Sequence, residues 1–336
     1  MDKVRVAVVG AGGIARGMHL PSLAEMEDVE LIAICDLLED RAVDLAQKHA
    51  IPRVYTTYRK MLADEEIDAV FSLVEPANLF HVTWNSLDAG CHVFMEKPPG
   101  VTALQAESLA RKADDAGRIL QVGFNRRHIP LVREVTQLVE QHTRVTMVEG
   151  CFYKCGTGAF DRGSTSAFVS DTIHAVDLVR WIAGGTPVET ASVLASYDEP
   201  FVNAWSAVAR FDNGVTGVIK GHYRTGGRVH KFEVHGAGVS AYINLGFGSA
   251  GLDAVILSHE GKVQYSLAAR GEGAEGIVRL DGKALAGSDE FRKYYGFFPE
   301  DRHFIDCVKS GTQPETSIHD AVKTFRWVEQ IAAGGI

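Results

Sequence analysis

The chain has 336 residues, 46% hydrophobic and 23% charged, which is typical of a globular protein with room for two domains. A formal net charge of −9, without a long basic tract, argues against nucleic acid as a partner, and no apolar run reaches the roughly 18 residues of a membrane span. Five cysteines and a strand-like N-terminus without a signal-peptide pattern predict a cytoplasmic protein with free thiols. Cys151 and Cys155 lack a second ligand pair, so we interpret them as structural and predict no metal site.

The first predicted strand, Lys3–Val9, leads directly into the motif G-x-G-x-x-A at positions 10–15. A glycine motif between a strand and a helix is typical of dinucleotide-binding folds. The first glycine permits a tight turn, the second lets backbone approach a pyrophosphate, and the helix N-terminus stabilises its charge. The predicted cofactor-binding residues of this loop are Gly10, Gly12, Gly13 and Ile14.

A second predicted strand, Val29–Cys35, ends at Asp36. An acid at this position accepts hydrogen bonds from the adenine ribose and repels a 2′-phosphate. No arginine lies between Asp36 and Arg41 to neutralise a 2′-phosphate, so NAD is favoured over NADP as the cofactor. Asp36 could also cap a helix over Glu39–His49, and the two roles are compatible.

Strand and helix patterns continue to alternate up to about residue 124, which predicts a doubly wound parallel sheet and a dinucleotide-binding domain over residues 1–124. The remaining predicted strands are Val54–Tyr55, Ile67–Val74, Cys91–Met95 and Ile119–Val122, and the remaining helices are Tyr58–Ala63, a segment after Asn78 that ends at Gly90, and Leu104–Ala116.

The stretch Cys91–Gly100, CHVFMEKPPG, places Lys97 just beyond a buried parallel strand. Ligands of open parallel sheets bind at the carboxyl ends of the strands. Pro98 keeps Lys97 out of the helical conformation, and on an extended segment Glu96 points the opposite way. Taken alone, Lys97 could equally be a surface lysine in a turn.

The pattern changes after Gly123, which predicts an α+β domain over residues 125–336 with an open-faced, mostly antiparallel sheet. Asp212-Asn213-Gly214 is a hairpin signal, and the last two helices are placed so that they can pack back on the first domain. The predicted helices are Pro130–Gln141, Asp171–Ala183, Arg302–Lys309 and Ile318–Ile331, and the predicted strands are Thr143–Tyr153, Val188–Ser196, Ala204–Phe211, Val215–His222, Val229–Val234 and Ser240–Asn244.

Seven short motifs resemble the glucose–fructose oxidoreductase / inositol dehydrogenase (Gfo/Idh/MocA) family over nearly the whole chain. The resemblance implies a Rossmann domain, a substrate domain and an NAD(P)-dependent dehydrogenase of sugars or polyols. The motifs are GAGGIA at 10–15, ANLFH at 77–81, AGCHVFMEKP at 89–98, VGFNRR at 122–127, HAVD at 174–177, FDNG at 211–214 and HFID at 303–306.

Carried over by position, the resemblance implies that Lys97 and His174 face the reacting hydroxyl. Histidine, with an ordinary pKa of about 6.5, is suited to accept its proton, so we take His174 as the base and Lys97 as the polarising or relaying group. The family usually has an aspartate at the position of Ser170, and Asp171 is the nearest replacement unless it only caps the helix. The other implied residues are Asn78, His81, Glu96 and Lys97 for the cofactor, and Lys97, Arg127, Asp171 and His174 for the substrate.

Three functions remain open at this point. The first is an NAD-dependent dehydrogenase of a sugar, cyclitol or glycoside, the second an NAD-dependent glycosidase that oxidises transiently, and the third a non-catalytic cofactor-binding regulator. The sequence shows no dense Arg/Lys cluster, which favours a neutral polyhydroxylated ligand. An exposed sheet face must be covered, so we expect a homodimer or homotetramer.

Overall fold

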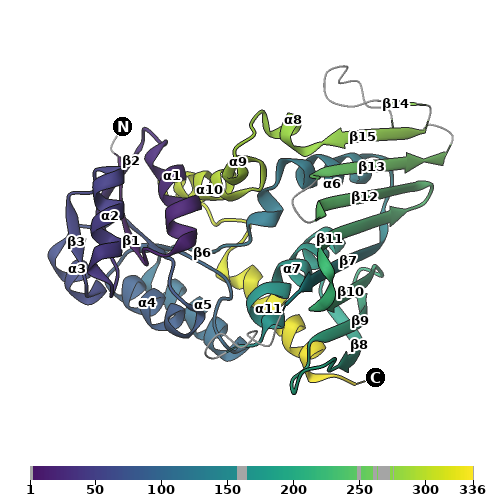
Figure 1. Cartoon of the computed structure of the whole chain (residues 1–336), viewed down its shortest axis with the longest axis horizontal. Helices are drawn as coiled ribbons and strands as arrows, with labels where there is room; N and C mark the ends of the chain where they lie inside the picture. The colour runs from purple at the N-terminus through teal and green to yellow at the C-terminus, as the bar shows by residue number, and fades with distance from the viewer. Residues whose placement is uncertain are drawn as a thin grey trace. The chain divides into compact units, whose positions relative to one another are not determined.

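The computed structural model describes residues 3–156, 165–247, 251–259, 263, 273–274 and 276–335. The described chain divides into two compact units (Figure 1). One unit contains the described residues up to Asn125, Thr165 and Phe297–Phe325, and the other contains the rest. The chain therefore returns to its first unit after building most of the second.

The first unit is built on a parallel sheet of six strands in the order β3-β2-β1-β4-β5-β6. This order, with helices between successive strands, is that of a doubly wound dinucleotide-binding fold, as the sequence predicts. The strands are β1 (Val4–Val9), β2 (Val29–Cys35), β3 (Arg53–Tyr55), β4 (Ala69–Ser72), β5 (His92–Met95) and β6 (Leu120–Val122), and the helices are a π-helix (Ala15–His19), α1 (Leu20–Ala24), α2 (Glu39–His49), α3 (Tyr58–Asp64), α4 (Pro76–Asp88), α5 (Ala103–Ala116) and α10 (Phe297–Ser310).

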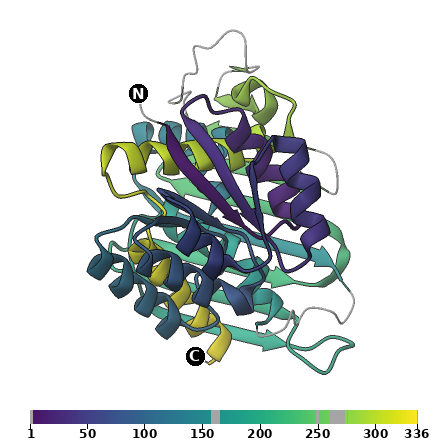
Figure 2. The same cartoon turned by 90° about the vertical axis from the view of Figure 1, so that its left-hand side faces the viewer.

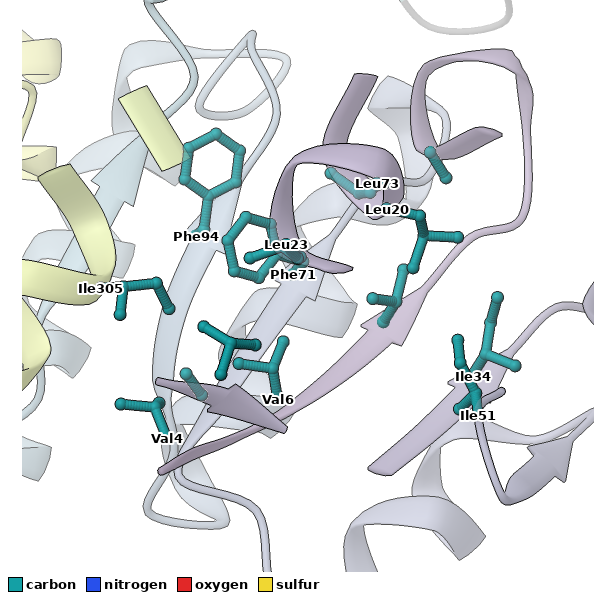
Figure 3. Packing of buried hydrophobic residues seen from close by; sticks show 14 of the residues in the cluster. Val4, Val6, Leu20, Leu23, Ile34, Ile51, Phe71, Leu73, Phe94 and Ile305 are labelled. Atoms are coloured by element: carbon teal, nitrogen blue, oxygen red, sulfur yellow. The ribbon is translucent and has the colours of Figure 1, made fainter. Parts of the chain in front are cut away.

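Helix α10 completes the hydrophobic core of this unit. It begins five residues before the predicted helix Arg302–Lys309 and packs beside α1, as the yellow-green helix next to the purple N-terminal segments in Figure 2. Figure 3 shows Phe71 of β4 and Phe94 of β5 side by side; their ring centroids are 4.8 Å apart. Phe304 of α10 meets the Phe71 ring edge-on at 5.4 Å, so a segment from the end of the chain covers this face of the sheet.

The second unit is built on a sheet of nine strands in the order β14-β15-β13-β12-β11-β7-β10-β9-β8 (Figure 1). All pairs are antiparallel except β7 with β10, so the predicted mostly antiparallel sheet is confirmed. The strands are β7 (Val145–Cys155), β8 (Pro187–Ala195), β9 (Ala204–Phe211), β10 (Thr216–His222), β11 (Arg224–Gly236), β12 (Val239–Phe247), β13 (Asp253–Ser258), β14 (Gly273–Ala274) and β15 (Ile277–Asp281).

The helices of the second unit differ from the predicted ones mainly at their ends. The predicted helix Asp171–Ala183 is a π-helix over Phe168–Thr172 followed by α7 (Ile173–Ala183), which packs on β7 and β10. Strands β13 to β15 and two short helices were not predicted. The other helices are α6 (Pro130–His142), α8 (Gly282–Ala286) and α9 (Phe291–Tyr294), while a 3₁₀-helix (Asn125–His128) and α11 (Ile318–Ala333) each contribute residues to both units.

Candidate active site

The glycine loop after β1 combines one constrained position with two open ones. Gly10 has φ +105°, and a Cβ on it would lie 2.4 Å from the carbonyl oxygen of Leu73, so only glycine fits there. A Cβ on Gly12 or Gly13 would meet no atom within 4 Å. The backbone is therefore exposed where the helix begins, and the first N–H groups of a helix have no intrahelical acceptor. These features fit the pyrophosphate of a dinucleotide.

Asp36 braces this loop from the end of β2. Its Oδ2 accepts a hydrogen bond from the Ala11 N–H at 2.7 Å, and its Oδ1 accepts one from the Leu38 N–H at 2.9 Å. The predicted role of Asp36 as a helix cap was wrong, because Leu38 is the N-cap of α2 and no side chain caps that helix. A carboxylate has about four acceptor sites, so both oxygens can still accept from ribose hydroxyls.

The other predicted cofactor residues follow the same edge of the sheet. Lys97 is half-buried just beyond β5, while Asn78 and His81 are exposed on α4, which follows β4. Strands β2, β1, β4 and β5 are neighbours, and parallel strands end at one edge of their sheet. The glycine loop, Asp36, Lys97 and the beginning of α4 therefore lie along this edge.

Glu96 is held in a buried ion-pair network that the sequence analysis missed. His19 is fully buried; its Nδ1 lies 2.8 Å from Oδ1 of Asp301 and its Nε2 lies 3.2 Å from Oε1 of Glu96. A neutral imidazole has only one N–H, so the imidazolium form satisfies both contacts. Burial opposes the charge, but the two carboxylates outweigh it and raise the pKa of His19 to about 10.

This network reaches Lys97 through the backbone. Oε2 of Glu96 accepts a hydrogen bond from the Lys97 N–H at 3.1 Å. Burial works against ionised Glu96, yet the hydrogen bond from His19 and the charge of Lys97 lower the pKa of its carboxyl. The carboxylate predicted to contact cofactor thus faces the protein interior, where it fixes the segment that carries Lys97.

In the second unit, Asp171 contacts a side chain of β7 and one from the turn between β10 and β11. It forms an ion pair with Lys154 of β7, and its Oδ2 accepts a hydrogen bond from the Tyr223 hydroxyl at 3.2 Å. Asp171 lies in the π-helix before α7 and caps no helix, so the capping interpretation was wrong. Ser170, at the position where the family usually has the aspartate, donates to the Ser166 carbonyl at 3.1 Å. Asp171 is therefore the acidic side chain available at this turn.

His174 lies in the first turn of α7 and is half-buried. Asp177, one turn further, binds Arg127: Nε of Arg127 donates to Oδ2 at 2.7 Å, and a second nitrogen donates to Oδ1. Both side chains of this pair are only 1% exposed. Arg127, predicted to bind substrate, thus anchors the helix that presents His174.

Across the described ranges, no three or more His, Cys, Asp or Glu side chains are grouped so that they could hold a metal ion. No helix in the described part of the chain is both long and apolar enough to span a bilayer. The five cysteines are free thiols.

Comparison with known proteins shows the family to which the chain belongs. The model of the GFO/IDH/MocA oxidoreductase family with an NAD-binding Rossmann fold matches residues 4–124, and the model of the GFO/IDH/MocA C-terminal domain matches residues 133–241. The chain belongs to the GFO/IDH/MocA family of oxidoreductases, which confirms the predicted resemblance, fold class and enzyme class.

Among curated relatives, D-glucoside 3-dehydrogenase of Escherichia coli is 30% identical over 56% of this chain and 56% of its own length. Myo-inositol 2-dehydrogenase of Thermotoga maritima is 28% identical over 64% of this chain and 67% of its own. The match thus spans little more than half of the first relative and two thirds of the second. A dehydrogenase from Chromobacterium violaceum has the same fold, with a TM-score of 0.87, 20% identity and coverage of 99% of this chain and 95% of its own.

Proposed function

We propose that the protein is an NAD-dependent dehydrogenase that oxidises a carbinol carbon of a sugar, cyclitol or glycoside. One observation carries the proposal: the glycine loop, Asp36 and Lys97 lie at the same edge of a family-typical Rossmann sheet. The relatives named as glucoside and inositol dehydrogenases support the substrate class. The cofactor would be held by the Gly10–Ile14 backbone, Asp36, Asn78 and His81.

In this proposal NAD⁺, when bound, accepts the hydride from the carbinol carbon. His174 removes the hydroxyl proton, so a carbonyl forms as the C–H and O–H bonds break. Lys97 stabilises the negative charge that develops on the oxygen. The His19–Glu96–Asp301 network fixes the backbone at Lys97, and the pair of Asp177 with Arg127 fixes the helix of His174.

NAD is favoured over NADP by the surroundings of Asp36. Leu37 and Leu38 follow it as exposed apolar side chains, with 85% and 53% of their surfaces accessible. Arg16, the nearby cation of the first helical segment, pairs with Asp44 at 2.5 Å. The Asp36 carboxylate would repel a 2′-phosphate, and neither leucine can neutralise one.

The test is absorbance at 340 nm with either nucleotide and a panel of inositols, monosaccharides, uronates, sugar phosphates and glycosides. We expect reduction with NAD, and a loss of at least about 100-fold in kcat for both Lys97→Ala and His174→Ala, with nucleotide binding retained by His174→Ala. Arg210→Gln, which removes an exposed charge, is the control. Binding of NAD without reduction of any compound would refute the dehydrogenase in favour of a glycosidase or a regulator, and cleavage of a labelled glycoside separates those two.

A further inference from the structure

A buried arginine in the second unit makes no hydrogen bond or ion pair to a carboxylate among the described residues. Arg126 is 3% exposed, and its guanidinium lies over the ring of Phe152 at 4.9 Å. One of its nitrogens lies 3.0 Å from Nδ1 of His230, and the other terminal nitrogen, Nη1, has no hydrogen-bond partner among the described residues. An arginine remains protonated in proteins, so this is a buried positive charge.

The residues around Arg126 add further positive charge. Phe152 and His230 are directly opposite each other on β7 and β11, with ring centroids 3.9 Å apart. Arg228, two residues before His230 on the same strand, lies 3.4 Å from the same Nδ1 and donates to the Tyr295 hydroxyl at 3.0 Å. Burial and the adjacent guanidinium groups lower the pKa of His230 far below its usual value. The ring is therefore neutral, with Nδ1 as acceptor and the proton on Nε2.

Lys154 is the third cation of this group, and its Nζ lies 5.0 Å from the centre of the Phe152 ring. It is already paired with Asp171. No ion pair to a carboxylate is found for Arg126 or Arg228 within the described ranges. The group, which we call the Arg126 cluster (Arg126, Phe152, Lys154, Arg228 and His230), therefore contains two guanidinium groups without a paired carboxylate in the described ranges. Asp171, the carboxylate whose charge reaches Arg126, is itself paired with Lys154.

An unpaired charge away from water is costly, and proteins ordinarily provide a counter-charge or lower the charge itself. Burial does lower the pKa of Arg126, but arginine cannot lose its proton near neutral pH. The planar guanidinium fork matches carboxylate and phosphate oxygens in pairs. Nη1 of Arg126, Nε of Arg228 and Nε2 of His230 are all buried donors without a partner among the described side chains. The cluster thus has the donors of an oxyanion site.

We propose that the Arg126 cluster binds an oxyanion, a carboxylate or phosphoryl group, carried by the substrate. The inference rests on the proposed function, because it places this group on the sugar or polyol that is oxidised. Asp171 links the cluster to the proposed catalytic helix: it pairs with Lys154 and lies three residues before His174. The sequence favoured a neutral ligand because it shows no dense Arg/Lys cluster. The Arg126 cluster instead favours an acidic sugar or a sugar phosphate.

The test compares matched neutral and anionic compounds on the full chain. Calorimetry in the presence of NADH would measure binding of glucose, glucuronate and glucose 6-phosphate, of galactose and galacturonate, and of inorganic phosphate alone. We expect at least one anionic member to bind about 10-fold or more tightly than its neutral counterpart, with a preference that falls as salt rises. Tighter binding of a uronate than of its neutral sugar would identify the ligand group as a carboxylate. Tighter binding of glucose 6-phosphate than of glucose would identify it as a phosphoryl group.

Two variants assign the preference to the cluster. Arg126→Met keeps an apolar stem on Phe152 but removes the charge, and Arg228→Gln removes a charge from a half-buried position that depends less on core packing. Each should reduce the anion preference about 10-fold or more, while Arg210→Gln, an exposed charge on β9, should leave it unchanged. Thermal melting shows which variants are folded.

The inference is overturned if no anionic member binds more tightly than its neutral counterpart, or if the preference survives in both folded variants. These results are distinct from a failure of the proposed function. Reduction of neutral compounds at 340 nm without an anion preference would remove the oxyanion site but keep the dehydrogenase. Anion-selective binding without reduction of any compound would keep the oxyanion site but remove the dehydrogenase.

Discussion

His19 links two segments that are far apart in the sequence of the first unit. Its contacts to Glu96 and Asp301 span 77 and 282 residues. The ring packs against Phe94 at 5.1 Å and meets Phe297 edge-on at 5.9 Å, so water is excluded around the charges. Removing one member of such a network leaves buried charges unpaired.

We predict that His19→Gln lowers the free energy of unfolding by about 3–5 kcal/mol near neutral pH. The folded-state pKa of His19, about 10, lies above its unfolded value of 6.5. Its contribution to stability is therefore fully present below about pH 6.5 and is lost as the pH rises through about 10. Urea unfolding of both proteins should show the difference shrinking over this range.

The control is His319→Gln, because His319 is half-exposed and bonds to Asp114 at the surface. Its effect should stay below about 1 kcal/mol. A His19→Gln deficit that is independent of pH would show that His19 is neutral in the folded protein.

Among the proposed site residues, those carried by local motifs could be predicted from the sequence. Gly10, Asp36 and Lys97 each follow a strand, and a position after a strand can be recognised from neighbouring residues alone. Neither partner of His19 could be predicted, because nothing near position 19 indicates a contact with residue 301.

At the scale of elements, the turn between β1 and the first helical segment contains two glycines with different roles. Gly10 is required by the fold, since its φ is positive and Leu73 approaches it closely. Gly12 lies in open space, so the fold does not require it. Its place at the helix N-terminus instead suits the close approach of a phosphate.

We therefore predict opposite results for two alanine substitutions. Gly12→Ala should leave the urea midpoint nearly unchanged and weaken NAD binding by about 10-fold or more, because a methyl group would occupy the approach to the pyrophosphate. Gly10→Ala should lower stability by about 1–3 kcal/mol or more, since the backbone conformation and the contact with Leu73 both oppose a side chain. Equal loss of NAD binding and stability in both variants would contradict the separation.

Element boundaries were predicted less well than the elements themselves. The helical segment that leads into His174 begins with a π-helix over Phe168–Thr172, which sequence periodicity does not reveal. Strands β13 to β15 extend the sheet one after another: β13 pairs with β12, β15 with β13, and β14 with β15.

At the scale of the whole molecule, the outer strands of the second sheet carry exposed apolar side chains that could form the interface of the predicted oligomer. Val193 of β8 and Val208 of β9 are on the same face, and 66% and 51% of their surfaces are exposed. Exposed β-branched side chains on a sheet edge favour pairing with another surface.

We predict a homodimer or homotetramer by light scattering, and a shift toward monomer in the double variant Val193→Asp, Val208→Asp. The added charges would have to be desolvated in any interface on this face. Leu104→Asp, at an equally exposed position on α5, is the matched control and should leave the assembly unchanged. A monomeric natural protein would refute the predicted assembly.

The sequence by itself determined the parallel Rossmann sheet, the mostly antiparallel second sheet and the glycine-loop motif. Each depends on periodicity or on spacing within a few residues, which short-range backbone geometry controls. Only the tertiary structure paired His19 with Asp301 and assembled Arg126, Lys154 and Arg228. Those contacts depend on which distant strands become neighbours, a property of the folded chain as a whole.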